Sequence, residues 1–510
     1  MKIIFRILLF LSIFLSFSVT SQAQDHPLKR EFRGVWITSM NNVDWPTIQG
    51  LTSEEQQEEF RSLLTMHRKN GFNAVLVQIR PSADVLYDSP YEPWSRWLSG
   101  KEGNKPNPFY DPLTFMIKEC HQQGMEFHAW INPFRAIYDF KNVEMDPGHL
   151  FYKNPQWLLT YGKHIYLDPG MAQARAYVLK VVMDIVNRYE VDGIHFDDYF
   201  YPYHVDSLAF PDDTTFKLYG EGFEDKREWR RQNINLFVKA VYDSMQAVKP
   251  EVKFGISPFG VWHNSNPDTL DSLTQVGPAN YEDLFADVIT WLQNGWVDYV
   301  VPIIDFGVDS SSVEYQDLLS RWSQNTYGKQ LYIGQAAYKI HHEQDSLRLG
   351  ATQLPELIRT HWKNFQVDGQ VYYSARPPMQ SPALNHDVSQ YNYYPYDALI
   401  PAMTWKPGQT PDPPSDLKVA RHKHDVLVQW ESNIHQPAHY YVVYLQQGDT
   451  APNISNSKYI LGKTSEKRFS FSEKGTGLLR KKYCLVVTAV DQQHRESLPS
   501  HPVMIRLYDY

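Results

Sequence analysis

The chain has 510 residues and a formal net charge of −9, so it has room for a large domain and a smaller one. An acidic balance gives no basic footprint for nucleic acid, and we expect no nucleic-acid partner. The only two cysteines, Cys120 and Cys484, are too few and too distant for a disulfide framework or a zinc site. We therefore expect free buried thiols, no metal and no other cofactor.

The first 23 residues are typical of a signal peptide. Lys2 and Arg6 form a basic start, an apolar run follows, and Ser21-Gln-Ala23 is a small-residue cleavage site. The apolar run is too short for a membrane-spanning helix, and no later segment is apolar enough for one. We expect an exported protein without a transmembrane segment, located in the periplasm or outside the cell.

From about residue 30 to residue 405, short apolar segments alternate with helix-length sequence. Eight segments have the character of buried strands: Gly34–Thr38, Ala74–Ile79, Glu126–Ile131, Gly193–Phe196, Lys253–Ser257, Tyr299–Ile304, Leu331–Gly334 and Gln370–Ser374. Eight strands separated by helices are the count of a closed (β/α)8 barrel, so the predicted fold class is α/β with a TIM-type barrel.

The connections within this region differ in length. Links from a helix to the next strand are short and carry glycine, the expected helix stop, as in Asn70-Gly-Phe72. Links from a strand to the next helix are long, notably 132–169, 199–226 and 258–279. In a barrel these long links share one rim, where active sites are built, so we expect the site at the carboxyl ends of the strands.

The last hundred residues have a different pattern. Residues 406–414 are a proline-rich linker, and residues 415–510 contain short alternating strands that predict a small all-β sandwich. The opening Pro413-Pro-Ser-Asp-Leu417 and the strand with Trp430 resemble a fibronectin type III module. We expect this module to act as a spacer or a docking surface.

Two adjacent carboxylates, Asp197 and Asp198, follow the buried strand at 193–196. Neighbouring side chains on a strand point to opposite faces, so one is predicted to face a cavity while the other orients it. A helix cap or an ion pair is the alternative role for either residue. Glycoside hydrolysis needs two carboxyl groups, so a partner should come from another strand end. The candidates are Asp305, Glu92 and Asp84.

Amide, aromatic and basic residues surround the other strand ends. We expect these to position a sugar: Trp36, Gln78, Arg80, Trp130, Asn132, His195, Tyr199, Trp262 and Tyr338. Alternatively, Arg80 forms an ion pair with an acidic group. The alternative role of Trp262 is to pack within its loop. Carboxylates, amides and aromatics at one barrel mouth favour glycoside hydrolysis with a polysaccharide substrate.

Several motifs together resemble the glycosyl hydrolase-like 10 family, from about residue 31 to residue 405. They include Arg33-Gly-Val-Trp-Ile-Thr-Ser39, Gln78-Ile-Arg-Pro81, His128-Ala-Trp-Ile-Asn-Pro133 and Gly193-Ile-His-Phe-Asp-Asp-Tyr-Phe-Tyr201. Exported members include a bacterial enzyme that cleaves peptidoglycan glycan strands stripped of their peptides. The resemblance implies a TIM-type barrel and a glycosidase for a bacterial envelope polysaccharide. One departure is Pro302-Ile-Ile-Asp-Phe306, where relatives usually carry Pro-Gln-x-Tyr-Trp.

Two other functions remain open at this point. A non-catalytic glycan-binding protein would lack two cavity-facing carboxyls about 5–9.5 Å apart. A metal-dependent carbohydrate esterase or deacetylase would need a ligand set, for which His128, His195 and Asp197 are the only source.

Overall fold

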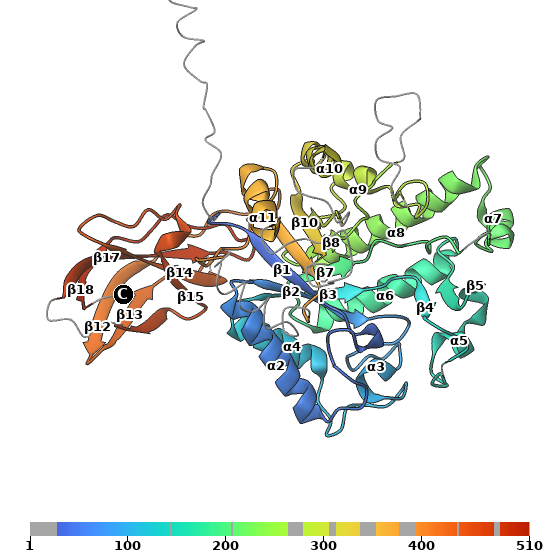
Figure 1. Cartoon of the computed structure of the whole chain (residues 1–510), viewed down its shortest axis with the longest axis horizontal. Helices are drawn as coiled ribbons and strands as arrows, with labels where there is room; N and C mark the ends of the chain where they lie inside the picture. Colours follow the sequence, from blue (N-terminus) through green and yellow to red (C-terminus); the bar gives the residue numbers. More distant parts are fainter. Residues whose placement is uncertain are drawn as a thin grey trace, which may run out of the picture.

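The computed structural model describes residues 28–508 except 143, 206–207, 264–278, 305–312, 337–352, 377–393, 436–437 and 474–479. Figure 1 shows a barrel with its helices and, beside it, a group of antiparallel strands formed by the last part of the chain. The predicted signal peptide lies outside the described residues. In the part that the structure describes, no helix is both long and apolar enough to cross a membrane.

Eight parallel strands close the barrel, which confirms the predicted fold class. In chain order they are β1 (Phe32–Ile37), β2 (Ala74–Arg80), β3 (Glu126–Ile131), β7 (Gly193–Phe196), β8 (Lys253–Ile256), β9 (Tyr299–Val300), β10 (Gln330–Ala336) and β11 (Gly369–Tyr373). All eight predicted strand segments are present, and β1 pairs with β11 to complete the ring. β9 is shorter than predicted because Pro302 has no N–H to donate to a strand ladder.

Seven helices follow the strands around the barrel: α2 (Ser53–Lys69), α4 (Pro112–Gln122), α6 (Ala172–Arg188), α8 (Lys226–Val248), α9 (Val288–Asn294), α10 (Val313–Gln324) and α11 (Gln353–Lys363). α2 shows how the sequence specifies them. Thr52 and Glu55 form a capping box at its start, and Phe60, Leu63 and Leu64 bury one face against the strands.

The long strand-to-helix links carry structure of their own. The link at 132–169 contains a three-stranded antiparallel sheet of β4 (Arg135–Ile137), β5 (Leu158–Tyr161) and β6 (His164–Leu167). Short helices α3 (Arg96–Ser99), α5 (Leu150–Lys153) and α7 (Asp213–Tyr219) lie in these links too. The rim at the carboxyl ends of the strands therefore carries additional helices and strands, as the long strand-to-helix links predict.

Aromatic rings fill the interior of the barrel, and glycines on neighbouring strands leave space for them. A Cβ added to Gly255 would lie 2.0 Å from a ring carbon of Tyr299, and one added to Gly193 would lie 2.4 Å from Nδ1 of His128. Distances this short are incompatible with any side chain at either glycine. The two glycines thereby fix where the rings of Tyr299 and His128 sit.

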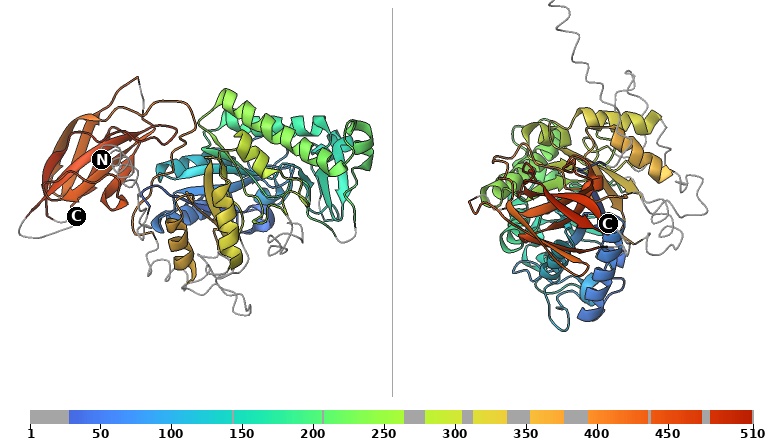
Figure 2. Two further views of the ribbon diagram at one scale, coloured as in Figure 1. Left: turned by 90° about the horizontal axis from the view of Figure 1, so that it is seen from above. Right: turned by 90° about the vertical axis from the view of Figure 1, so that its left-hand side faces the viewer.

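The C-terminal residues form two antiparallel sheets, which agrees with the predicted all-β sandwich. One contains β12 (Ser415–His422), β13 (Asp425–Glu431) and β16 (Arg468–Ser472); the other contains β15 (Ile460–Thr464), β14 (Tyr440–Gln447), β17 (Lys481–Val490) and β18 (Val503–Leu507). Figure 2 shows them packed beside the barrel. Leu399 packs against Val442 and Val486 of the second sheet. Cys120 and Cys484 are free and buried, as predicted.

Candidate active site

A cavity of about 350 Å³ opens at the carboxyl ends of the barrel strands, on the rim predicted for the site. Its walls come from almost every strand of the barrel. The lining residues are Trp36, Thr38, Met40, Gln78, Trp130, Asp197, Asp198, Tyr199, Tyr203, Ser257, Phe259, Ile303, Gln335, Ala336 and Tyr373. Acidic, amide and aromatic side chains thus line one cavity, whose volume is that of a small-ligand site.

Asp197 and Asp198 both line this cavity. The prediction that their side chains diverge is wrong, because β7 ends at Phe196 and the alternation of a strand does not extend to the residues after it. Burial, together with the neighbouring charge of Asp197 and a hydrogen bond between the two carboxyl groups, raises the pKa of Asp198 well above its usual range. Asp198 is therefore the carboxyl group whose proton is the more strongly favoured by its surroundings.

Asp197 is held by N–H donors. Its Oδ2 accepts from Asn132 Nδ2 at 2.7 Å, and its Oδ1 accepts from the backbone N–H of Asp198 at 3.0 Å. Such donors stabilise negative charge on a carboxylate. The two neighbours thus differ: Asp198 is buried and has a raised pKa, and Asp197 is anchored as an acceptor.

A short series of amides fixes the orientation of Asp197. The backbone N–H groups of Ser39 and Met40 donate to Gln78 Oε1, which leaves Gln78 Nε2 to donate to Asn132 Oδ1 at 2.6 Å. Asn132 must then present its Nδ2 to Asp197, and the same nitrogen lies 2.9 Å from the hydroxyl of Tyr199. The amides of Gln78 and Asn132, both predicted as site residues, are therefore locked in one orientation.

Two tryptophans line the cavity as predicted. Trp36 donates its indole N–H to His195 Nε2 at 3.1 Å. The indole Nε1 of Trp130 is buried and has no acceptor among the residues that the structure describes. A buried donor without a partner is costly, so this nitrogen is an unsatisfied group beside the cavity wall.

Arg80 and Glu92 lie behind the cavity and do not line it. Arg80 Nη2 is 2.5 Å from Glu92 Oε1 and Arg80 Nε is 2.7 Å from Glu92 Oε2, and both side chains are fully buried. Arg80 Nη1 also donates to the backbone oxygen of Asn132. The ion-pair alternative for Arg80 is thus what the structure shows, with Glu92 as the partner.

The other predicted site residues lie in different places. His195 is buried beneath Trp36, and Trp262 packs against the hydrophobic core. Asp84 is buried and accepts from the backbone N–H of Ser82. Asp305 and Tyr338 lie outside the described residues. In the described ranges, no three His, Cys, Asp or Glu side chains gather as metal ligands would.

Nine lining residues are not among the predicted site residues: Thr38, Met40, Tyr203, Ser257, Phe259, Ile303, Gln335, Ala336 and Tyr373. Three of them lie in the last residues of β10 and β11, and the others lie in the links that follow the strands, where no periodicity marks which side chain turns inward. Their one available signal is position, since each lies at or soon after the carboxyl end of a barrel strand.

The glycosyl hydrolase-like 10 family matches residues 31–347 of the chain. The chain belongs to this family. Among curated relatives of this glycosyl hydrolase-like 10 protein, "Glycosyl hydrolase YngK" of Bacillus subtilis is 37% identical over 479 residues, covering 92% of each chain. "Glycosyl hydrolase DigH" of Escherichia coli K12 is 34% identical over 340 residues, covering 63% of this chain and 75% of its own.

Among solved structures, the glycoside hydrolase domain of PgaB from Bordetella bronchiseptica matches with a TM-score of 0.45 and 11% identity. The match covers 72% of this chain and 98% of that domain. Similarity at that level carries no information about the activity of this glycosyl hydrolase-like 10 protein.

Proposed function

We propose that this protein is an exported glycoside hydrolase that cleaves a bacterial envelope polysaccharide, with peptidoglycan glycan strands as the substrate to test first. The observation that carries the proposal is the pair of cavity-lining carboxyl groups in different electrostatic environments. Family membership and the names of the two relatives support hydrolysis of glycosidic bonds.

The geometry gives the two carboxyl groups separate roles. Asp198, whose pKa is raised, has a proton to give to the leaving oxygen of the glycosidic bond. Asp197, anchored by Asn132, supplies negative charge to the oxocarbenium-like sugar of the transition state. A water molecule then bonds to the anomeric carbon in place of the leaving oxygen and returns one proton to Asp198. Trp36 and Trp130 offer aromatic surface to the sugar. Asp305 remains a candidate second carboxylate from the sixth barrel strand.

The domain organisation is part of the proposal. Residues 1–23 would direct export, residues 30–405 would form the catalytic barrel, and residues 406–414 would link it to a fibronectin type III-like module at 415–510. The two antiparallel sheets of the C-terminal region support the last assignment.

The test is to incubate purified peptidoglycan, with and without its peptides, with the protein and to identify released fragments by mass. Asp198→Asn and Asp197→Asn should each fold normally and lose at least about a hundredfold in rate, the usual contribution of a general acid or charge stabiliser. Asp213→Asn, an exposed carboxylate at the start of α7, is the control and should cleave at the wild-type rate.

Wild-type-like turnover by both Asp198→Asn and Asp197→Asn would rule out this assignment of the chemistry. Tight binding of the glycan by the wild-type protein with no released fragments would instead favour a non-catalytic glycan-binding protein.

A further inference from the structure

A series of hydrogen bonds runs through the interior of the barrel, from the cavity to the opposite end. Trp36 Nε1 donates to His195 Nε2, and His195 Nδ1 lies 3.1 Å from the hydroxyl of Tyr299. The same hydroxyl is 2.8 Å from His128 Nδ1, and His128 Nε2 is 3.0 Å from Glu126 Oε2. Below Trp36, the side chains of this series are buried away from water.

The two ends of the series fix the direction of every bond in it. An indole nitrogen can only donate, so His195 accepts at Nε2 and carries its proton on Nδ1. Because Nε2 accepts, this imidazole is neutral, and burial, which lowers the pKa of His195 well below its usual range, favours the neutral form. With His128 as a neutral imidazole, Tyr299 accepts a hydrogen bond from His195 Nδ1 and donates one to His128 Nδ1. His128 then donates from Nε2 to Glu126.

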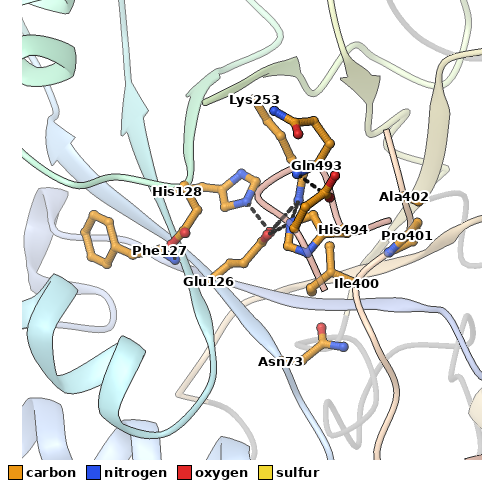
Figure 3. Close-up of polar contacts among 12 residues, drawn as sticks. Asn73, Glu126, Phe127, His128, Lys253, Ile400, Pro401, Ala402, Gln493 and His494 are labelled. Carbon is orange, nitrogen blue, oxygen red and sulfur yellow. Dashed lines mark hydrogen bonds and ion pairs between the residues drawn. The ribbon is translucent and has the colours of Figure 1, made fainter. Parts of the chain in front are cut away.

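Glu126 is the last acceptor of the series. His494, from the C-terminal region, helps to keep its carboxylate ionised (Figure 3). Lys253 Nζ lies 2.7 Å from both carboxylate oxygens, and His494 Nε2 lies 2.7 Å from Oε1. Burial acts to raise the pKa of Glu126, but Lys253 and His494 outweigh it and hold that pKa well below its usual range.

His494 reaches the barrel from a rigid turn between β17 and β18. Asp491 accepts from the backbone N–H groups of Gln493 and Arg495, and the backbone of Gln493 bonds to Met403 on the chain leaving the barrel. His494 itself has φ +59°, a left-handed conformation that a non-glycine residue adopts only where its surroundings impose it. The turn therefore presents this imidazole to the base of the barrel in a fixed position.

We propose that the C-terminal sheets position the active site: His494 fixes Glu126, and the series through His128, Tyr299 and His195 holds the indole of Trp36 in the cavity. Residues 126, 128, 195, 299 and 494 are positioning residues, and only Trp36 meets the ligand. The consequence for glycan binding rests on the proposed function, whereas the state of the Trp36 indole can be measured without it.

The indole N–H of Trp36 gives the direct readout. In protein labelled with 15N-tryptophan, its resonance is identified by its loss in Trp36→Phe. Tyr299→Phe removes one hydroxyl and leaves His195 Nδ1 without an acceptor, so we expect the resonance to shift and its proton to exchange with solvent about fivefold to tenfold faster, the scale of one hydrogen bond. Tyr332→Phe is the matched control, because this buried hydroxyl bonds Gln330 and stands outside the series.

The contribution of the C-terminal sheets is tested at His494. His494→Asn tolerates the left-handed backbone but is too short to reach Glu126, and it should shift the Trp36 resonance in the same direction as Tyr299→Phe. His494→Gln can place an amide N–H near the position of Nε2 and should restore the wild-type signal. His439→Gln, whose ring lies 6.3 Å from that of His494, is the control on the same sheets.

An unchanged Trp36 resonance in His494→Asn, with a shift in Tyr299→Phe as the positive control, overturns the proposal. No shift in Tyr299→Phe overturns it as well. Binding of purified peptidoglycan glycan strands is measured in parallel, and His494→Asn should bind about fivefold more weakly. If the wild-type protein does not bind these strands, the proposed function fails while the resonance still decides the positioning role.

Discussion

At the scale of single residues, burial determines what each charged side chain can do. Burial and the neighbouring carboxylate of Asp197 raise the pKa of Asp198. Glu92 is equally buried, but Arg80 binds it through two hydrogen bonds. Two acidic groups near one rim therefore have different surroundings: Asp198 lines the cavity, and Glu92 is ion-paired behind its wall.

Glu92→Gln should destabilise the fold by about 3–5 kcal/mol, because it leaves the buried charge of Arg80 without a partner. Denaturant unfolding would measure the loss. The double variant Arg80→Met with Glu92→Leu should recover most of it. If Glu92→Gln is as stable as the wild-type protein and yet loses turnover, Glu92 belongs to the chemistry.

At the scale of elements, the hydrophobic pattern of the sequence is sufficient to predict the barrel. It is not sufficient to predict how the side chains of the site are oriented. All eight strands were recognisable because each is a short apolar run between helices. The orientation of Asp197 and Asp198 could not be predicted, because it depends on how the chain turns after Phe196. Contacts such as that of His494 with Glu126 join distant segments, and no local pattern encodes them.

Gly255, in a barrel strand, leads to a second prediction at the scale of elements. Gly255→Ala should cost about 3 kcal/mol by overpacking, because its Cβ would collide with the ring of Tyr299. Gly222→Ala is the comparison: nothing lies within 4 Å of its Cβ, and only its φ of +88° opposes the change, at about 1 kcal/mol. Equal unfolding free energies for the two variants would show that the Tyr299 ring can move aside.

At the scale of the whole molecule, the join between barrel and C-terminal sheets should respond to pH. Burial, with a contribution from Lys253, lowers the pKa of His494 from 6.5 to about 4, while Glu126 acts in the opposite direction. Between pH 4 and pH 6.5, His494 binds a proton in the unfolded chain but not in the folded chain. Stability contributed by the neutral ring is present above pH 6.5 and is lost as the pH falls toward 4.

His494→Gln keeps a donor for Glu126 but does not titrate. Its melting temperature should therefore fall less than that of the wild-type protein between pH 6.5 and 4. Thermal unfolding of both proteins across this range is the measurement. Buried groups away from His494, such as His67 with a pKa lowered by burial to about 4, act equally in both and cancel in the difference. Glu126, whose pKa His494 helps to lower, contributes to the difference together with His494. Parallel curves would show that His494 is not neutral in the fold.

The pairing of β1 with β11 and of Lys29 with Glu496 has a consequence for biosynthesis. Phe32 stands opposite Gly369, and Lys29 bonds a residue 467 positions later. A ribosome releases the first strand long before its neighbour exists, so the ring cannot close until most of the chain has been made. Such late, long-range closure slows folding and keeps the nascent polypeptide open, the state in which a chain can be threaded across a membrane.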